Sequence, residues 1–286
     1  MSDTALIVGV GDIHGRFHRV RTWLDTLERA LERPVDAVLA VGDVEAFATA
    51  DDQRRKAAKR TMPAEFAAFA RGEARMTRPF YFIGGNNEDF ESLHDLPNGG
   101  EVAPGVHYLG RVGTASIAGL RVGWLSGIYA PKWLDTPLQP PTTAATRKQA
   151  GYFRRDEVDR LRAEGRLDLL LTHEWPRGLF ASTPGKPVRP WMGNPVTRAL
   201  VDDLQPPWLL CGHSHEQFAA TLHHGGGVQT RVACLDEAAE SDGSMLWMEW
   251  SGGHAIRVGW GIDGHVSWTP SQSWGAPRGA SVRRVP

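Results

Sequence analysis

Short runs of apolar residues, each followed at once by glycine and polar residues, recur along the chain. Residues 5–10, 37–41, 80–83, 167–171 and 208–211 form such runs. Their length and continuity predict strands that are buried on both faces. Closely spaced strands with glycine turns are also predicted over 106–109, 115–117 and 122–125, and a strand-and-turn pattern continues over 218–260.

Helical periodicity separates several of these strands. Apolar residues recur at steps of three and four from Phe17 to Leu31, which predicts a helix that ends before Pro34. A second helix is predicted over residues 155–163. A third is predicted to begin after Asn194, because asparagine is a favoured N-cap and a proline follows it.

Two segments are predicted from composition rather than from periodicity. Residues 50–76 are charged and rich in alanine, which indicates helix. Residues 130–150 are rich in proline and threonine, which indicates a long loop. The order of strands and helices predicts an α/β fold of two packed sheets with helices outside. We expect one domain over residues 1–267 and a flexible tail over residues 268–286.

Composition narrows the class of protein. The chain has 286 residues, of which 41% are hydrophobic, and its net charge is −1. A polyanionic partner would therefore need a local basic patch or bound cations. Cys211 and Cys234 lie in apolar runs, which predicts two reduced, buried thiols in a cytoplasmic protein. We see no signal peptide and no apolar stretch of about 20 residues, so no membrane association is expected.

Candidate chemistry follows directly after the five buried strands, in the motifs "GDIHGR", "GDVEAF", "GGNNED", "THEWPRG" and "CGHSHEQ". Residues two apart in an extended segment point the same way, so each closely spaced pair can reach one ion. Oxygen and nitrogen ligands without thiolate suit Mn²⁺, Fe²⁺ or Zn²⁺, and so many ligands suit two divalent ions. The predicted metal ligands are Asp12, His14, Asp43, Asn86, His173, His213 and His215.

The order of these motifs resembles that of the calcineurin-like metallophosphoesterases. That resemblance implies a four-layer α/β/β/α sandwich of two mixed sheets with a binuclear metal site at the strand ends. Asp43 would bridge the two ions. By the same resemblance, one ion would be held by Asp12, His14, Asp43 and His215, and the other would be completed by Asn86, His173 and His213.

A narrower resemblance is to RNA lariat debranching enzymes, which hydrolyse the 2′,5′-phosphodiester at a branch point. The segments "FIGGNNE", "SGIYAPK" and "THEWPRG" contribute to it, and it runs from about residue 6 to residue 236. Asp12 stands where those enzymes usually have cysteine. Asn87 stands where the family usually has a histidine that protonates the leaving oxygen, and asparagine cannot deliver a proton. Asp43, His14 and Asn87 are therefore the predicted catalytic positions, with Asn87 altered.

Three explanations of Asn87 are open at this stage. Another group, such as His18, Glu45 or Glu88, could supply the proton. The substrate could instead be an ester with a good leaving group. The protein could also be a weak or silent enzyme that binds metal and a phosphorylated ligand. A general acid is typically worth about 10²–10⁴-fold in rate, so the choice among the three matters.

Several residues near the motifs are candidates for binding substrate. Arg16 and Arg177 follow ligand motifs, and their guanidinium groups could form bidentate hydrogen bonds with phosphate oxygens. Tyr129, Lys132 and Trp175 could form a rim on which a base stacks. The favoured hypothesis is a phosphodiesterase that uses a metal-bridging hydroxide, acting on a phosphate ester such as a nucleic acid or nucleotide. The alternatives are a phosphomonoesterase or nucleotide phosphatase, or a phosphate-binding protein. The oligomeric state is not predicted.

Overall fold

Two mixed β-sheets form the framework of the protein in a computed structural model, which describes residues 4–49, 51–52, 63–179, 181–182, 193–238, 242–261 and 281–282. β1, β2, β3 and β5 run parallel in the first sheet, with antiparallel neighbours at both edges. In spatial order this sheet contains β14 (His254–Trp260), β13 (Met245–Ser251), β1 (Ala5–Val10), β2 (Ala37–Ala40), β3 (Phe80–Phe82), β5 (Val106–Tyr108) and β4 (Gly100–Ala103).

The second sheet has six strands. Its inner strands β12, β10, β8 and β7 are parallel, and its edge strands β11 and β6 are antiparallel to their neighbours. In order, its strands are β11 (Phe218–His223), β12 (Gln229–Cys234), β10 (Trp208–Cys211), β8 (Leu169–Thr172), β7 (Leu120–Leu125) and β6 (Val112–Ile117). Both sheets are therefore mixed, as the family resemblance implied.

Successive side chains along each strand point to opposite faces of the sheet, and this divides the hydrophobic core into three layers. In β1, Val8 packs toward the helical side of the first sheet, whereas Ile7 packs between the two sheets. In β10, Leu210 packs between the sheets and Leu209 faces the opposite side. Successive side chains of a strand point to opposite faces, so strands buried on both faces must be apolar throughout. This requirement explains the continuous apolar runs in the sequence.

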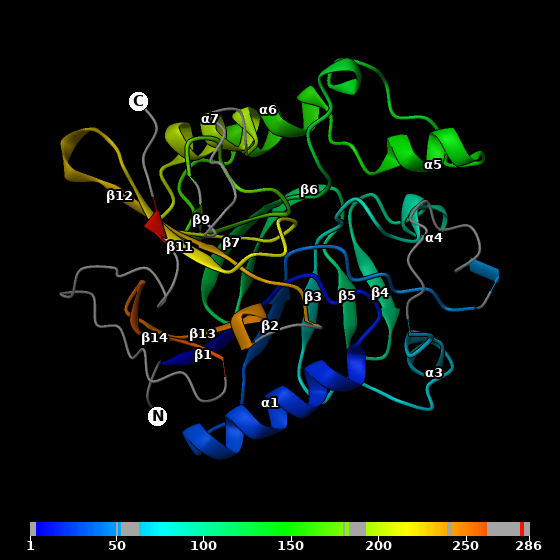
Figure 1. The fold of residues 1–286 in the computed structure, drawn as a ribbon, viewed down its shortest axis with the longest axis horizontal. Helices are drawn as coiled ribbons and strands as arrows, with labels where there is room; N and C mark the ends of the chain where they lie inside the picture. The colour runs from blue at the N-terminus through cyan, green and yellow to red at the C-terminus, as the bar shows by residue number, and fades with distance from the viewer. Residues whose placement is uncertain are drawn as a thin grey trace.

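Helices cover the outer faces of the two sheets. α1 (Phe17–Leu31) lies on the first sheet, while α6 (Arg155–Ala163) and α7 (Pro195–Leu204) lie on the far side of the second (Figure 1). The Asn194 side chain accepts hydrogen bonds from the first-turn N–H groups of Val196 and Thr197, which confirms the predicted N-cap. The layers are thus α/β/β/α, and the predicted fold is confirmed.

Two sequence-based assignments of secondary structure were wrong in part. The loop predicted over residues 130–150 contains a short 3₁₀ helix, η1 (Pro131–Trp133), and a helix, α5 (Ala144–Ala150). Its prolines precede α5, and the Thr143 side chain caps the helix. The helix predicted over residues 50–76 is not continuous in the described ranges. There α3 (Phe66–Ala70) ends before Gly72, whose φ of 74° stops the helix.

The remaining elements are short. They are α4 (Phe90–His94), the 3₁₀ helices η2 (Gly225–Gly227) and η3 (Asp242–Ser244), and the pair β9 (Ala181–Ser182) and β15 (Ser281–Val282). Apart from β15, the tail predicted over residues 268–286 lies outside the described residues. No helix within the described ranges is long and apolar enough to cross a membrane.

Candidate metal centre

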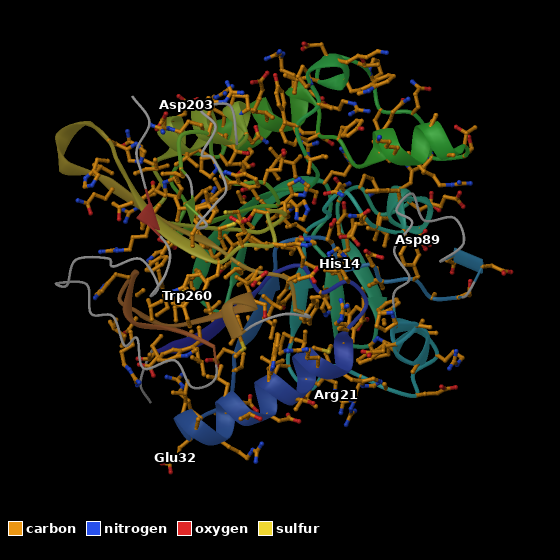
Figure 2. The ribbon with its side chains drawn as sticks, in the orientation of Figure 1. His14, Arg21, Glu32, Asp89, Asp203 and Trp260 are labelled. Atoms are coloured by element: carbon orange, nitrogen blue, oxygen red, sulfur yellow. The ribbon has the colours of Figure 1, made fainter. Side chains whose placement is uncertain are left out.

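Five strand ends from the two sheets bring the seven predicted ligands together. The loops that hold them follow β1, β2 and β3 of the first sheet and β8 and β10 of the second. In Figure 2, His14 lies between α1, marked by Arg21, and α7, marked by Asp203. The cluster therefore forms at the carboxyl ends of parallel strands, where sites in α/β folds usually lie.

Asp12, His14 and His215 form one group, which we call the first position. One ligand atom from each lies within 4.8 Å of the others. The Nε2 atoms of His14 and His215 are 3.2 Å apart, and His215 Nε2 is 3.1 Å from Asp12 Oδ2. Asp12 is fully buried, and among the described residues its Oδ2 has no partner in hydrogen-bonding geometry beyond the close His215 ring nitrogen. A buried carboxylate oxygen that faces imidazole nitrogens fits a bound cation.

Asp43, Asn86, His173 and His213 form the second position. His173 Nε2 lies 3.4 Å from Asp43 Oδ1 and 3.2 Å from Asn86 Oδ1. The His213 ring stands edge-on to that of His173, with centroids 4.9 Å apart. Asp12 also lies within reach of Asp43 and His173. Asp12 thus lies close to ligands of both positions. The bridging role predicted for Asp43 stays a prediction.

Hydrogen bonds on the outer ring nitrogens orient the histidines. His173 Nδ1 donates to the Val41 carbonyl at 2.8 Å, and His14 Nδ1 pairs with Glu45 Oε1 at 2.6 Å. His215 Nδ1 lies 3.0 Å from Glu237 Oε2. Placing the proton on Nδ1 leaves each Nε2 lone pair facing the cluster, which is the tautomer a metal ligand needs.

Glu237 is a site residue that sequence reasoning missed. It follows β12 in the same way that Asp43 follows β2, so an acidic residue just past a buried strand was the available signal. Glu45 was considered only as a proton source, but its carboxylate contacts the ring of His14. Glu88, the other acidic candidate, accepts backbone hydrogen bonds from Val44, Glu45 and Gly85. Its carboxyl group thereby joins the loops after β2 and β3.

Several site residues have left-handed backbone conformations. The φ angles are 48° at His14 and Asp43, 67° at His213 and 51° at His215. Non-glycine residues seldom adopt this region, and doing so costs about 1–3 kcal/mol each. The surrounding packing must hold these turns, since they turn the side chains inward just after each strand ends.

Glycines beside the ligands allow the close approach of the loops. A Cβ atom at Gly85 would overlap Asp43 Oδ1 and lie 2.8 Å from His173 Nε2. A Cβ atom at Gly212 would overlap Asp12 Oδ1. The glycines that end the apolar runs are therefore needed for space at the cluster.

Burial and charge shift the pKa values inside the cluster. Burial opposes ionisation of Asp43, but the nearby His173 and His14 and the hydrogen bonds from Asn87 outweigh it and lower its pKa. Burial, together with His173, lowers the pKa of His213 to about 4. At neutral pH the cluster thus offers an ionised Asp43 and a neutral His213, the protonation states that bind a cation.

The predicted substrate-binding residues differ in their surroundings. The Trp175 ring lies 6.3 Å from the ring of His213, so it borders the cluster. Arg177 is exposed, and Arg16 precedes α1 with a buried Nη1 that has no hydrogen-bond partner among the described residues. The Tyr129 ring stacks on Phe153 at 6.2 Å and packs against the core. The Lys132 ammonium group lies over the neighbouring ring of Trp133.

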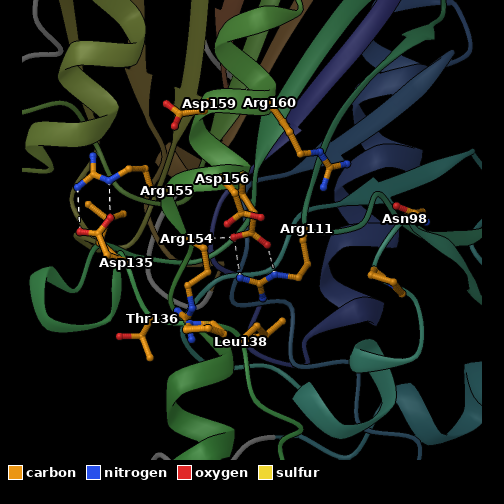
Figure 3. Close-up of a pocket in the computed structure, with 14 residues that line it drawn as sticks. Asn98, Arg111, Asp135, Thr136, Leu138, Arg154, Arg155, Asp156, Asp159 and Arg160 are labelled. Atoms are coloured by element: carbon orange, nitrogen blue, oxygen red, sulfur yellow. Dashed lines mark hydrogen bonds and ion pairs between the residues drawn. The ribbon is translucent and has the colours of Figure 1, made fainter.

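A cavity of about 690 Å³ lies apart from this cluster (Figure 3). None of the seven predicted ligands lines it. Its walls include the ion pairs Arg111–Glu157 and Arg155–Asp135, so much of its charge is neutralised internally.

The fold and the ligand cluster define a phosphoesterase of the calcineurin-like class. The chain matches the calcineurin-like phosphoesterase family over residues 5–217, and it belongs to that family. The seven predicted ligands all lie within the matched residues.

Within that family, curated relatives include lariat debranching enzymes. The chain is 29% identical over 250 residues to the enzyme of Mus musculus, a match covering 79% of this chain and 46% of the mouse protein. It is 30% identical over 231 residues to the enzyme of Homo sapiens, covering 75% and 42%. The matches thus span less than half of either relative. A crystal structure from Thermus thermophilus aligns with a TM-score of 0.48 at 13% identity, covering 91% of this chain and 99% of that one.

Proposed function

We propose that this protein is a metal-dependent phosphodiesterase that holds two divalent ions among the seven clustered ligands. The single observation that carries the proposal is the convergence of these ligands around the fully buried carboxylate of Asp12. Membership of a phosphoesterase family supplies the reaction class. The resemblance to lariat debranching enzymes, named for acting on lariats, favours a diester.

In this proposal the first position would hold one ion, the second position would hold the other, and Asp43 would be shared between them. Bound divalent ions of the Mn²⁺, Fe²⁺ or Zn²⁺ type would supply an activated water and offset negative charge on the phosphate. The chain's own contribution is to fix the ligands. The Nδ1 contacts of His14, His173 and His215 hold each ring in place.

The substrate would enter beside Trp175, whose half-buried ring borders His213. An aromatic ring at this place can stack on a base. The guanidinium group of the exposed Arg177 can donate two hydrogen bonds to phosphate oxygens. Arg16 is placed in the same role on the strength of its buried, unpartnered Nη1. Tyr129 stays a candidate for the rim. The cytoplasmic location predicted from the reduced cysteines belongs to this proposal as well.

Hydrolysis of bis-p-nitrophenyl phosphate and p-nitrophenyl phosphate with Mn²⁺ tests the proposal. We expect turnover of the diester that is lost in His14→Ala and Asp43→Ala. His254→Ala is the matched control, because His254 is an exposed histidine at the start of β14. Equal rates in the wild type and both site variants would contradict the assignment of His14 and Asp43 to the metal site. A strong preference for the monoester would favour the phosphatase alternative, and metal uptake without turnover would favour the binding-protein alternative.

A further inference from the structure

Two buried glutamates contact the first position from outside. Glu45 Oε1 lies 2.6 Å from His14 Nδ1. Glu237 Oε2 lies 3.0 Å from His215 Nδ1 and 3.8 Å from His14 Nε2. Both carboxylates are almost fully buried, at 2% and 4% exposure. The two histidines of this position therefore each have a carboxylate at the ring nitrogen that faces away from the cluster.

The second position is built differently. Nδ1 of His173 donates to the backbone carbonyl of Val41, which is a neutral acceptor. Asn86 contributes a neutral amide, and the ring of His213 lies 6.3 Å from the ring of Trp175. Within the described ranges, a glutamate is thus paired with the outer ring nitrogen of each histidine of the first position, whereas Glu174 and the buried Glu88 act on His173 and Asp43 only through their charge.

This asymmetry has a direct consequence for cation binding. A carboxylate that accepts the Nδ1 proton orients the imidazole and raises the basicity of its other nitrogen. Its negative charge also attracts a cation a few ångströms away, and burial weakens the screening of that attraction. A backbone carbonyl fixes the ring but adds no net charge. The paired glutamates therefore favour stronger binding of a cation at the first position.

We propose that Glu45 and Glu237 are positioning residues that make the first position the tighter of the two metal positions, so that it fills first. This inference rests on the proposed two-ion site and adds to it an order of loading. It assigns to the glutamates a role that acts through His14 and His215 and not by contact with substrate.

Metal titration of the full chain, stripped with a chelator, tests the inference. Mn²⁺ is added while binding is followed by calorimetry and by electron paramagnetic resonance, which distinguishes isolated from paired ions. For the wild type we expect a tight phase with isolated-ion spectra and then a weaker phase with paired-ion spectra. Glu45→Gln and Glu237→Gln should weaken the tight phase by about 10–100-fold and leave the weaker phase unchanged.

Two further variants test whether the effect on metal binding is specific to the two glutamates of the first position. Glu249→Gln is the matched control, because Glu249 is a buried glutamate on β13 that pairs with Arg257 away from the cluster. It should leave both phases unchanged. His213→Ala removes a ligand of the second position and should weaken only the second phase. Thermal unfolding of each metal-free variant shows whether the fold is retained, and glutamine keeps the shape and an acceptor oxygen of the original side chain.

The outcomes separate this inference from the proposed function. Two phases that the glutamate variants leave unchanged, or that they weaken equally, would overturn the inference while the two-ion site stands. Weakening of the first phase by His213→Ala would also overturn it, since the order of loading would then be reversed. Failure of the wild type to bind Mn²⁺ at all would overturn both.

Discussion

Asn87 donates two hydrogen bonds to the carboxylate of Asp43, one from its backbone nitrogen to Oδ1 and one from side-chain Nδ2 to Oδ2, each 2.7 Å long. The residue at the position where the family resemblance implies a histidine therefore has a structural role in the cluster. It holds the carboxylate that would reach both ions, and it does so with a group that cannot donate a proton to a leaving oxygen.

We expect Asn87→His to change leaving-group selectivity. A general acid is worth about 10²–10⁴-fold on alkoxide leaving groups and little on p-nitrophenolate. The variant should therefore gain rate on a 2′,5′-linked dinucleotide relative to bis-p-nitrophenyl phosphate. Steady-state rates on both substrates measure the ratio. Asn87→Ala is the control, because it removes the side-chain bond to Asp43 and adds no acid, so both rates should fall together. An unchanged ratio in Asn87→His would mean that the proton comes from elsewhere.

Gly85→Ala should disable the site without unfolding the protein. The added methyl group would overlap Asp43 Oδ1 and crowd His173 Nε2, so the loop after β3 must shift. Misplacement of reacting groups by about 1 Å can cost about 10²-fold in rate, and we expect a loss of that order with weaker metal uptake. Diesterase activity and metal content measure it. Gly225→Ala is the control, since a Cβ atom there meets no described residue within 4 Å. Equal activity in the two variants would contradict the prediction.

The strands and the clustering of the candidate ligands were predictable because both depend on local pattern. Each buried strand is an uninterrupted apolar run, and the residues just past it lie at the carboxyl edge of its sheet. The contacts of Glu45 and Glu237 were not predictable in this way, because they join residues from distant parts of the chain. Helix α5 was missed because prolines earlier in the same window dominated its composition, although Thr143 was an available capping signal.

Leu169→Ala should lower the free energy of unfolding by about 2–5 kcal/mol, because the truncation leaves a cavity between the two sheets. Leu169 is fully buried on β8 and belongs to the core layer between the sheets. Val228→Ala is the comparison, since Val228 is 41% exposed and should change stability by no more than about 0.5 kcal/mol. Denaturant unfolding of the metal-free proteins measures both. Similar losses in the two variants would show that this layer is not a tightly packed core.

The stability of the metal-free protein should depend on pH through His213. Its pKa falls from 6.5 to about 4 in the folded protein, because burial and the neighbouring His173 oppose its charged form. Between about pH 6.5 and 4 the unfolded chain therefore binds more protons at this residue than the folded protein does. The free energy of unfolding decreases as the pH falls through that window. His213→Gln should make this decrease smaller.

The pKa of His215 is shifted in the opposite direction to that of His213, so its contribution to stability should depend on pH in the opposite sense. The carboxylate of Asp12 raises its pKa, despite some burial, so its charged form is favoured by folding. The stabilisation from His215 is present below pH 6.5 and is lost as the pH rises through its raised pKa. His215→Gln should therefore remove a stabilisation that the wild type gains as the pH falls toward 6.5, which lies above the window in which His213 acts. Denaturant unfolding at a series of pH values, with chelator present, compares the wild type and both variants. If the two variants shift the pH dependence in the same direction, the electrostatic account of the cluster is wrong.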